Sequence, residues 1–235
     1  MLSLDRQERY RQLYTDRHPE WRPSSHVYRD LVASRLFADA HVLDLGCGRG
    51  GVMERLYKRA GLTSGLDPDV RSLREHRERD LALVCGLAHA LPYADDSFDL
   101  VCCSWVLEHL RRAEQTFSEI ARVLRDGGRF IFLTPNAHHP LLILNRGLHW
   151  TGGRLVDLLY DRGEPDIFPA YYRANTAERI DQLARNAGME RVSLKLVGDP
   201  TYLAFNRFLF WFACRLEDVT PRRMKVHLVG EYALR

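Results

Sequence analysis

The sequence has little net charge and no long apolar run. Its 34 basic and 31 acidic residues leave a formal charge of +3, which is too small for the strong field that attracts nucleic acid. No apolar run approaches the roughly 20 residues that cross a bilayer. The segment from Met1 to Tyr10 carries charged side chains instead of the apolar core of a signal peptide. We therefore expect no nucleic-acid partner, no integral membrane segment and a cytoplasmic location.

Cysteine is scarce and its spacing carries no signal. The five cysteines show neither metal-ligand spacing nor a disulfide framework, and Cys102 and Cys103, neighbours on one expected strand, face opposite ways. Reduced thiols in a cytoplasmic protein are the simplest account. The three scattered groups Glu108, His109 and His138 make a poor metal signature, so we predict no metal.

Nine residues from Val42 to Gly50 carry the strongest positive signal. An apolar run ends in an acid, and a glycine-rich turn then leads into a helical pattern over Gly51 to Ala60. Because glycine has no side chain, a ligand can approach the backbone of such a turn closely. The helix that follows directs its positive N-terminal end toward that ligand. This arrangement predicts a nucleotide-type cofactor site in a doubly wound α/β sheet.

Two acids narrow the choice of cofactor. Asp44 stands two residues before Gly46, at the end of the expected strand, where its carboxylate can accept from an ammonium group. Asp67 ends a second strand 21 residues after Gly46, where an acid accepts from both ribose hydroxyls, and Pro68 suits a first helical residue. The pattern Gly46-x-Gly48-x-x-Gly51 also fits a dinucleotide fingerprint, which keeps a nicotinamide-dependent oxidoreductase as an alternative.

Four ordered motifs between His41 and Asn136 resemble the class I S-adenosylmethionine (SAM)-dependent methyltransferases, in the small-molecule group that includes quinone-biosynthesis enzymes. Single motifs of this kind are weak, but four in the right order are specific. They are Asp44-x-Gly46-x-Gly48-x-Gly50, Gly65 to Asp69, Leu91 to Val101 running into Val106-Leu107-Glu108-His109, and Arg122 to Phe130 with its Asp126-Gly127-Gly128 turn.

Alternating periods agree with the fold that this resemblance implies, a Rossmann-like sheet of seven mostly parallel strands whose last strand is antiparallel. We expect an N-terminal helical cap over 1–40 and a SAM-binding domain over 41–235, with 136–175 as a substrate lid after the fifth strand, all in one structural domain. The expected strands are His41–Leu45, Leu62–Leu66, Leu81–Cys85, Phe98–Cys103, Arg129–Thr134, Arg191–Val197 and Lys225–Ala233; the expected helices include Leu4–Tyr14, Val27–Phe37 after Ser24 or Ser25, and one from Thr176 to Ala187.

The resemblance also implies a cofactor site. Asp44 and the turn of Gly46, Cys47, Gly48 and Gly50 would shape its methionine end. The ribose would lie at Asp67 and Pro68, the adenine at Leu87 and Ala88, and the sulfonium near Ser104 and Trp105. Relatives usually have an acid where this chain has Leu87, which predicts weaker cofactor binding and leaves a non-catalytic domain that binds SAM or S-adenosylhomocysteine as an alternative.

The implied reaction moves a methyl group from SAM to a small or medium acceptor, with S-adenosylhomocysteine as the product. We favour a hydroxyl oxygen of a metabolite, sugar or lipid-linked intermediate, and N- or C-methylation stays open. A hydroxyl needs a base, and His109 is the first candidate, since its ordinary pKa lies near neutrality. His138 is the second candidate base, and the expected acceptor-binding residues are His139, Tyr171, Tyr172 and Arg173.

The two ends of the chain carry further apolar and aromatic groups. Tyr10, Tyr14, Arg22 and Tyr28 are candidates to close over the cofactor's carboxylate, with simple packing as the alternative. The segment 202–215 is apolar nearly all round if helical, which favours burial in a core or in a homodimer; peripheral lipid contact is the sharper alternative. A monomer is equally compatible with the sequence.

Overall fold

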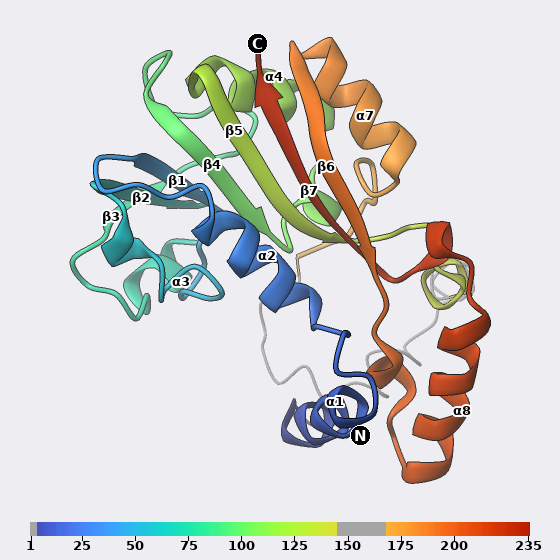
Figure 1. Ribbon diagram of the computed structural model, residues 1–235. Coiled ribbons are helices and arrows are strands. Elements are labelled where there is room, and N and C mark those ends of the chain that lie inside the picture. The colour runs from blue at the N-terminus through green and yellow to red at the C-terminus, as the bar shows by residue number, and fades with distance from the viewer. Residues whose placement is uncertain (1–3, 145–167) are drawn as a thin grey trace. The chain divides into compact units, whose positions relative to one another are not determined.

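The computed structural model describes residues 4–144 and 168–235 (Figure 1). The chain forms two compact units. One comprises Met1–Ser24, Asn136–Pro169 and Leu196–His227, and the other comprises Ser25–Pro135, Ala170–Lys195 and Leu228–Arg235. The second unit contains nearly all of the sheet and is described first.

The sheet has seven strands in the order β3-β2-β1-β4-β5-β7-β6. β1 is parallel to β2 and β4, β2 is parallel to β3, and β4 is parallel to β5. β7 runs opposite to β5 (Figure 1). This confirms the expected α/β architecture. The strands are β1 (His41–Leu45), β2 (Leu62–Asp67), β3 (Ala82–Cys85), β4 (Phe98–Ser104), β5 (Leu124–Pro135), β6 (Met189–Val197) and β7 (His227–Leu234).

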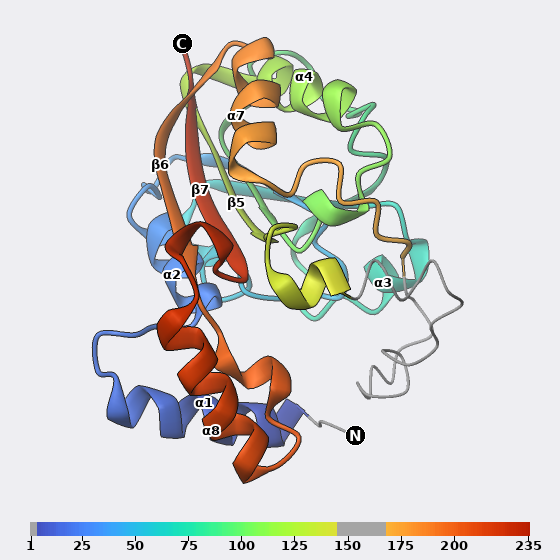
Figure 2. The same ribbon diagram turned by 90° about the vertical axis from the view of Figure 1, so that its right-hand side faces the viewer.

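Helices cover both faces of the sheet, because parallel strands need crossovers that return on either side. α4 (Ala113–Val123) and α7 (Ala177–Asn186) lie together on one face, and α2 (Ser24–Ala33) lies on the other (Figures 1 and 2). α7 begins after Thr176, whose hydroxyl accepts from the Arg179 amide, and Gly188 follows it with a φ of +79°. The predicted limits of this helix are confirmed.

Three local predictions are wrong. The segment Gly51 to Ala60 is not an α-helix: it forms turns and a 3₁₀ helix (Tyr57–Arg59), with bonds between residues three apart, such as Leu56 N–H to the Met53 carbonyl at 2.8 Å. Pro68 does not open a helix, because Asp69 caps the short α3 (Val70–Arg74) with its carboxylate. α2 starts earlier than expected, so Ser24 is its first residue, and its Oγ contacts Nδ1 of His227 at 2.9 Å.

The other unit pairs α1 (Leu4–Arg17) with α8 (Arg207–Val219). Tyr14, Ala204, Phe210 and Cys214 form its buried cluster, and the ring of Tyr10 lies 4.5 Å from that of Phe210. Tyr10 and Tyr14 therefore pack against other residues of this unit. This is the packing alternative that the sequence left open for them. The 3₁₀ helices Pro200–Leu203 and Arg222–Met224 flank α8.

The apolar segment 202–215 is only partly buried. Asn206 caps α8 by accepting from the Leu209 amide at 2.9 Å, and the helix buries Phe210, Ala213 and Cys214. Phe208 and Phe212 point outward, with 78% and 55% of their surface exposed. One face of this helix is therefore buried in the core of its unit, while burial of the other face in a homodimer stays a prediction.

The central part of the predicted lid, residues 145–167, lies outside the described residues, so the lid over 136–175 and the cap over 1–40 stay predictions. None of the helices in the described ranges has the length and apolar character that crossing a membrane requires.

Candidate cofactor and acceptor site

Asp44 is buried between two neighbours on the sheet that have a short side chain or none. It is 4% exposed, and its partners in register are Gly65 on β2 and Cys102 on β4. Residues in register project to the same face, so one absent and one short side chain flank the carboxylate. Tyr57 donates a hydrogen bond of 2.5 Å to its Oδ2. Burial raises the pKa of Asp44 to about 6; the Tyr57 bond opposes this shift and nearby Asp67 adds to it.

Asp67 ends β2 and is held by two backbone amides. Its Oδ2 accepts from Gly48 N–H at 2.9 Å, and its Oδ1 accepts from Asp69 N–H at 2.9 Å. Burial raises its pKa, while these two bonds and the charge of Arg49 lower it. The glycine turn and the second acid are thus joined directly, as their spacing in the sequence predicts.

Backbone conformation and, at one position, a close side-chain contact require the glycines of the turn. Gly46, Gly48 and Gly50 all have positive φ, at 78°, 53° and 99°, which disfavours other residues. A Cβ on Gly46 would also overlap Cγ2 of Val106, so this glycine admits the Val106 side chain. The Cys47 side chain in the same turn is buried, which raises the pKa of its thiol.

The predicted adenine residues follow β3. Gly86 N–H donates to the Asp67 carbonyl at 3.2 Å, and a tight turn joins Leu87 to Ala90 through a 3.0 Å bond. Leu87 is 51% exposed at this turn. Leu87 and Ala88 therefore follow directly after a backbone contact with Asp67, the residue predicted to bind the ribose.

Ser104 and Trp105 stand at the carboxyl end of β4, the edge that also carries Asp44 and Asp67. Trp105 has a φ of +60°, and its N–H donates to the Leu133 carbonyl at 2.9 Å. A left-handed residue with an aromatic side chain is sparsely populated and persists only where its surroundings hold it. The chain leaves the strand here, and Trp105 stays about one-third exposed.

His109 belongs to the 3₁₀ helix Leu107–His109, beside a buried acid. Its Nε2 lies 3.9 Å from Oε1 of Glu108. Oε2 of Glu108 accepts from the Thr134 hydroxyl at 3.0 Å, and Thr134 Oγ1 accepts from Nδ2 of Asn175 at 2.6 Å. Glu108, Thr134 and Asn175 are all buried, and the hydrogen bonds between them end at a carboxylate that lies 3.9 Å from the imidazole.

The predicted acceptor residues lie beside the same loop. The amides of Tyr171 and Tyr172 both donate to the Glu108 carbonyl, at 2.7 and 3.1 Å, and Arg173 donates to the Arg111 carbonyl at 3.0 Å. The structure thus brings together residues that are more than sixty positions apart in the sequence.

His138 and His139 belong to the other compact unit. Asn136 anchors this stretch: its side chain donates to the carbonyls of Arg223 and Lys225 at 2.9 and 2.8 Å, and its Oδ1 accepts from His138 N–H at 3.1 Å. Burial lowers the pKa of His139 to about 4, with Lys225 contributing. His139 is therefore a neutral, buried imidazole at pH 7.

Sequence reasoning missed the residues that support the candidates. Tyr57 binds Asp44 from thirteen positions away, Thr134 on β5 donates to Glu108, and Asn175 donates to Thr134. Their only sequence signal is polarity next to a strand end or a loop, which many solvent-exposed residues share.

Comparison with known proteins agrees with this geometry. A family described as a methyltransferase domain matches residues 43–132. The ubiquinone biosynthesis O-methyltransferase of Azoarcus sp. (strain BH72) is 30% identical over 195 residues, which cover 75% of this chain and 80% of that protein. The demethylmenaquinone methyltransferase of Thermobifida fusca is 31% identical over 209 residues, covering 82% and 80%. A SAM-dependent methyltransferase from Mesorhizobium loti superimposes with a TM-score of 0.61 at 16% identity, covering 87% of this chain and 96% of that one.

The residues at the sheet edge fit such a cofactor. SAM has an ammonium group and two ribose hydroxyls, and the edge offers the buried carboxylates of Asp44 and Asp67. The nicotinamide alternative rested on the glycine pattern alone, and the relatives are methyltransferases. This chain belongs to the class I SAM-dependent methyltransferases, and it is an enzyme that uses S-adenosylmethionine as its cofactor.

Proposed function

We propose that the enzyme methylates a hydroxyl oxygen, on an aromatic ring, of a small or medium-sized acceptor. The bound cofactor supplies a methyl group on a positively charged sulfur, so the protein must align the acceptor and remove its proton. The arrangement that carries this proposal is His109 beside the buried Glu108 carboxylate.

His109 fits the role of the base. Its imidazole is about one-third exposed, so an acceptor can reach it, while the side chain of Glu108 behind it is buried. A carboxylate at 3.9 Å stabilises the positive charge that the ring gains with a proton. Thr134 donates to that carboxylate and is itself held by Asn175, so Glu108 acts as a positioning residue.

An aromatic acceptor fits the side chains around this base. Trp105 and Tyr171 are each a little over one-third exposed. Trp105 stands at the end of β4, and the Tyr171 amide donates to the Glu108 carbonyl. Exposed aromatic rings stack on other rings at little entropic cost. The relative from Azoarcus is named for O-methylation in ubiquinone biosynthesis, which supports the same class of acceptor.

The cofactor residues take the roles that their positions suggest. Asp44 accepts from the ammonium group and Asp67 from the ribose hydroxyls. Leu87 packs on the adenine ring, and the Ala88 amide forms a hydrogen bond with the edge of that ring. Gly46, Cys47, Gly48 and Gly50 line the methionine end. Ser104 and Trp105 lie near the sulfur, on the same sheet edge as Asp44.

Labelled methyl transfer tests this proposal. Isotope-labelled SAM is supplied with phenols, aliphatic alcohols, amines and a metabolite extract, and mass spectrometry locates the label. We expect labelled aryl methyl ethers, with His109→Gln reducing kcat by about 10²–10⁴-fold at unchanged SAM affinity. His18→Gln, just after α1, is the matched control and should retain full activity.

Three outcomes contradict the proposal. Label on carbon or nitrogen identifies a C- or N-methyltransferase of the same fold. Tight binding of S-adenosylhomocysteine with no transfer to any acceptor indicates a binding domain only. Full activity of His109→Gln removes that residue as the base.

A further inference from the structure

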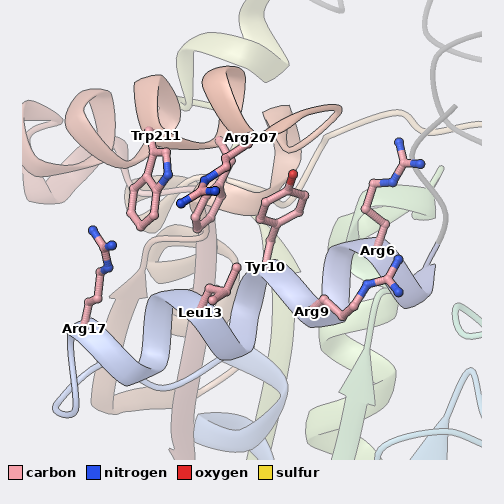
Figure 3. A pocket seen from close by; sticks show the side chains of 8 residues that line it. Arg6, Arg9, Tyr10, Leu13, Arg17, Arg207 and Trp211 are labelled. Atoms are coloured by element: carbon pink, nitrogen blue, oxygen red, sulfur yellow. The ribbon is translucent and has the colours of Figure 1, made fainter.

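The α1–α8 pocket lies within one compact unit, and its lining includes none of the residues from Asp44 to Trp105 that we propose to bind the cofactor. It has a volume of about 450 Å³, which is within the size range of small-molecule pockets. In Figure 3, Tyr10, Leu13 and Arg17 rise from α1 toward Arg207 and Trp211 on α8. The full lining consists of Arg6, Arg9, Tyr10, Leu13, Arg17, Arg207, Phe210 and Trp211.

Half of the lining residues are arginines. Arg6 and Arg9 lie at one end of the pocket and Arg17 at the other (Figure 3). Arg6, Arg9 and Arg17 lie within an arc of about 80° around α1. Asp5 and Asp16 flank Arg9 on that helix, but none of the described residues that line the pocket is an acid. The guanidinium of Arg17 stacks 3.9 Å from the centroid of the Trp211 ring, which holds that charge at the rim. The pocket therefore suits an anion.

An exposed apolar stripe runs along α8 beside the pocket. Phe208, Phe212 and Val219 are 78%, 55% and 75% exposed, and their spacing of four and seven residues aligns them on one side of the helix. Phe210 and Cys214, on another face, are buried with Tyr14. Large apolar side chains gathered at this exposure indicate an interaction surface.

We propose that the α1–α8 surface docks on a membrane containing anionic phospholipids. Phe208, Phe212 and Val219 enter the boundary between headgroups and acyl chains, and the arginines pair with lipid phosphates, one of which occupies the pocket. This combination distinguishes an interfacial helix from a helix that spans the bilayer.

Charge favours this occupant over two others. A second copy would bring two arginine-rich faces together, which is repulsive unless anions intervene. A free phosphate ion would use the arginines and leave the exposed aromatic side chains without a role. The acid Asp218 of α8 lies eleven residues from Arg207, about 16 Å along the helix, and so leaves the basic end of the surface intact.

Vesicle co-sedimentation of the full chain tests the proposal. The enzyme is mixed with vesicles of phosphatidylcholine alone or of phosphatidylcholine with phosphatidylglycerol, at low salt and at about 0.15 M salt. We expect binding only with phosphatidylglycerol, weakened by salt. The double variant Arg9→Gln/Arg207→Gln should bind about 20-fold more weakly, and Phe208→Ser/Phe212→Ser should lose binding at the higher salt.

The matched control is Arg74→Gln/Phe37→Ser, which alters an exposed arginine and an exposed phenylalanine in the other unit and should bind like the unaltered enzyme. Thermal melts and SAM affinity verify that each variant is folded. Should a variant unfold, the lipid selectivity and salt dependence of the unaltered enzyme still decide the matter.

Five results overturn the proposal. The first three are equal binding to both kinds of vesicle, no binding to either kind, and α1–α8 variants that bind as well as the control. The fourth is stabilisation by inorganic phosphate without vesicle binding, which makes the pocket a site for free anions. The fifth is a dimer, seen in light scattering without vesicle binding, that the phenylalanine variant dissociates. This result assigns the stripe to a second copy.

Discussion

The hydroxyl of Tyr57 donates a 2.5 Å hydrogen bond to Oδ2 of Asp44, the buried acid proposed to hold the cofactor's ammonium group. Desolvation favours the neutral carboxyl, and this bond opposes it by stabilising the charged form. Tyr57 thus helps to keep Asp44 available as a carboxylate near neutral pH.

Cofactor binding should follow the ionisation of Asp44. Because the pKa of Asp44 is raised to about 6, SAM affinity should increase as the pH rises from 5 to 7. Tyr57→Phe removes a bond that lowers this pKa, so the midpoint should move upward and affinity at pH 6.5 should fall by about 3–10-fold. Calorimetry across this pH range measures both effects.

Tyr232→Phe is the control for that experiment, since it removes a similar 2.6 Å bond from a tyrosine to Asp181, in the same unit. It should leave the pH profile of SAM binding unchanged. A Tyr57→Phe profile identical to that of the unaltered enzyme refutes the role of this bond.

The same ionisation should make the ligand-free enzyme less stable as the pH rises. The folded-state pKa of Asp44, about 6, exceeds its ordinary value of 3.8, so the folded state binds the proton more tightly and stability is lost between pH 4 and 6. Asp44→Asn keeps an acceptor for Tyr57 without a charge. It should gain up to about 3 kcal/mol over the unaltered enzyme at pH 8, and little at pH 4.

Urea unfolding at several pH values gives this difference. Asp80→Asn, at an exposed site, is the control and should show no comparable gain. A stability difference for Asp44→Asn that does not change with pH contradicts the assignment.

An acid at position 87 should strengthen cofactor binding. The family resemblance predicts an acid at the position of Leu87, and the 51% exposure of Leu87 allows a charged side chain there at little cost in stability. Leu87→Asp should tighten SAM binding about tenfold or more through a charge-assisted bond to the adenine amino group. Val192→Asp, on β6, serves as the control at a comparably exposed site. Unchanged or weaker binding places the adenine elsewhere.

Loss of the Glu108 charge should slow turnover without weakening cofactor binding. Glu108→Gln removes the carboxylate beside His109, and Thr134→Val removes its 3.0 Å donor. We expect kcat to fall by about 10–100-fold in the first variant and less in the second. The pH–rate profile should shift in Glu108→Gln, a change that a purely structural role would not produce. Glu190→Gln should behave like the unaltered enzyme, and parallel losses of SAM affinity would argue against positioning.

Gly46 should tolerate no side chain. Its φ of +78° and the overlap of an added Cβ with Val106 Cγ2 predict that Gly46→Ala costs roughly 2–4 kcal/mol. Val106→Ala in the same chain should restore part of that loss, which a double-mutant cycle measures. Gly51→Ala is the control, because nothing lies within 4 Å of its added Cβ. Equal costs at both glycines would contradict this account.

Local patterns predicted the strands well and the segment after the turn poorly. The alternation of apolar and glycine-rich segments placed β1 correctly, because a buried parallel strand needs a continuous apolar run. The helical periodicity of Gly51 to Ala60 is real, yet the chain forms turns there. The tight glycine turn and the contact from Tyr57 to Asp44 outweigh a weak local preference.

The site residues also divide into those that the local sequence predicts and those that it does not. Spacing in the sequence identified Asp44, Asp67 and the glycines, since strand ends and turns are local features. Nothing local links Tyr171 to Glu108, or Asn175 to Thr134, because loop-to-loop contacts depend on how distant segments meet.

By itself the sequence determined the α/β class, the glycine turn and the placement of the two acids at strand ends, because each depends on a few consecutive residues with fixed backbone geometry. Only the tertiary structure decided that Tyr57 faces Asp44, that Glu108 supports His109, and that α8 buries one face while exposing Phe208. These outcomes depend on which side chains exclude water from one another, and that is settled by packing between segments far apart in the chain.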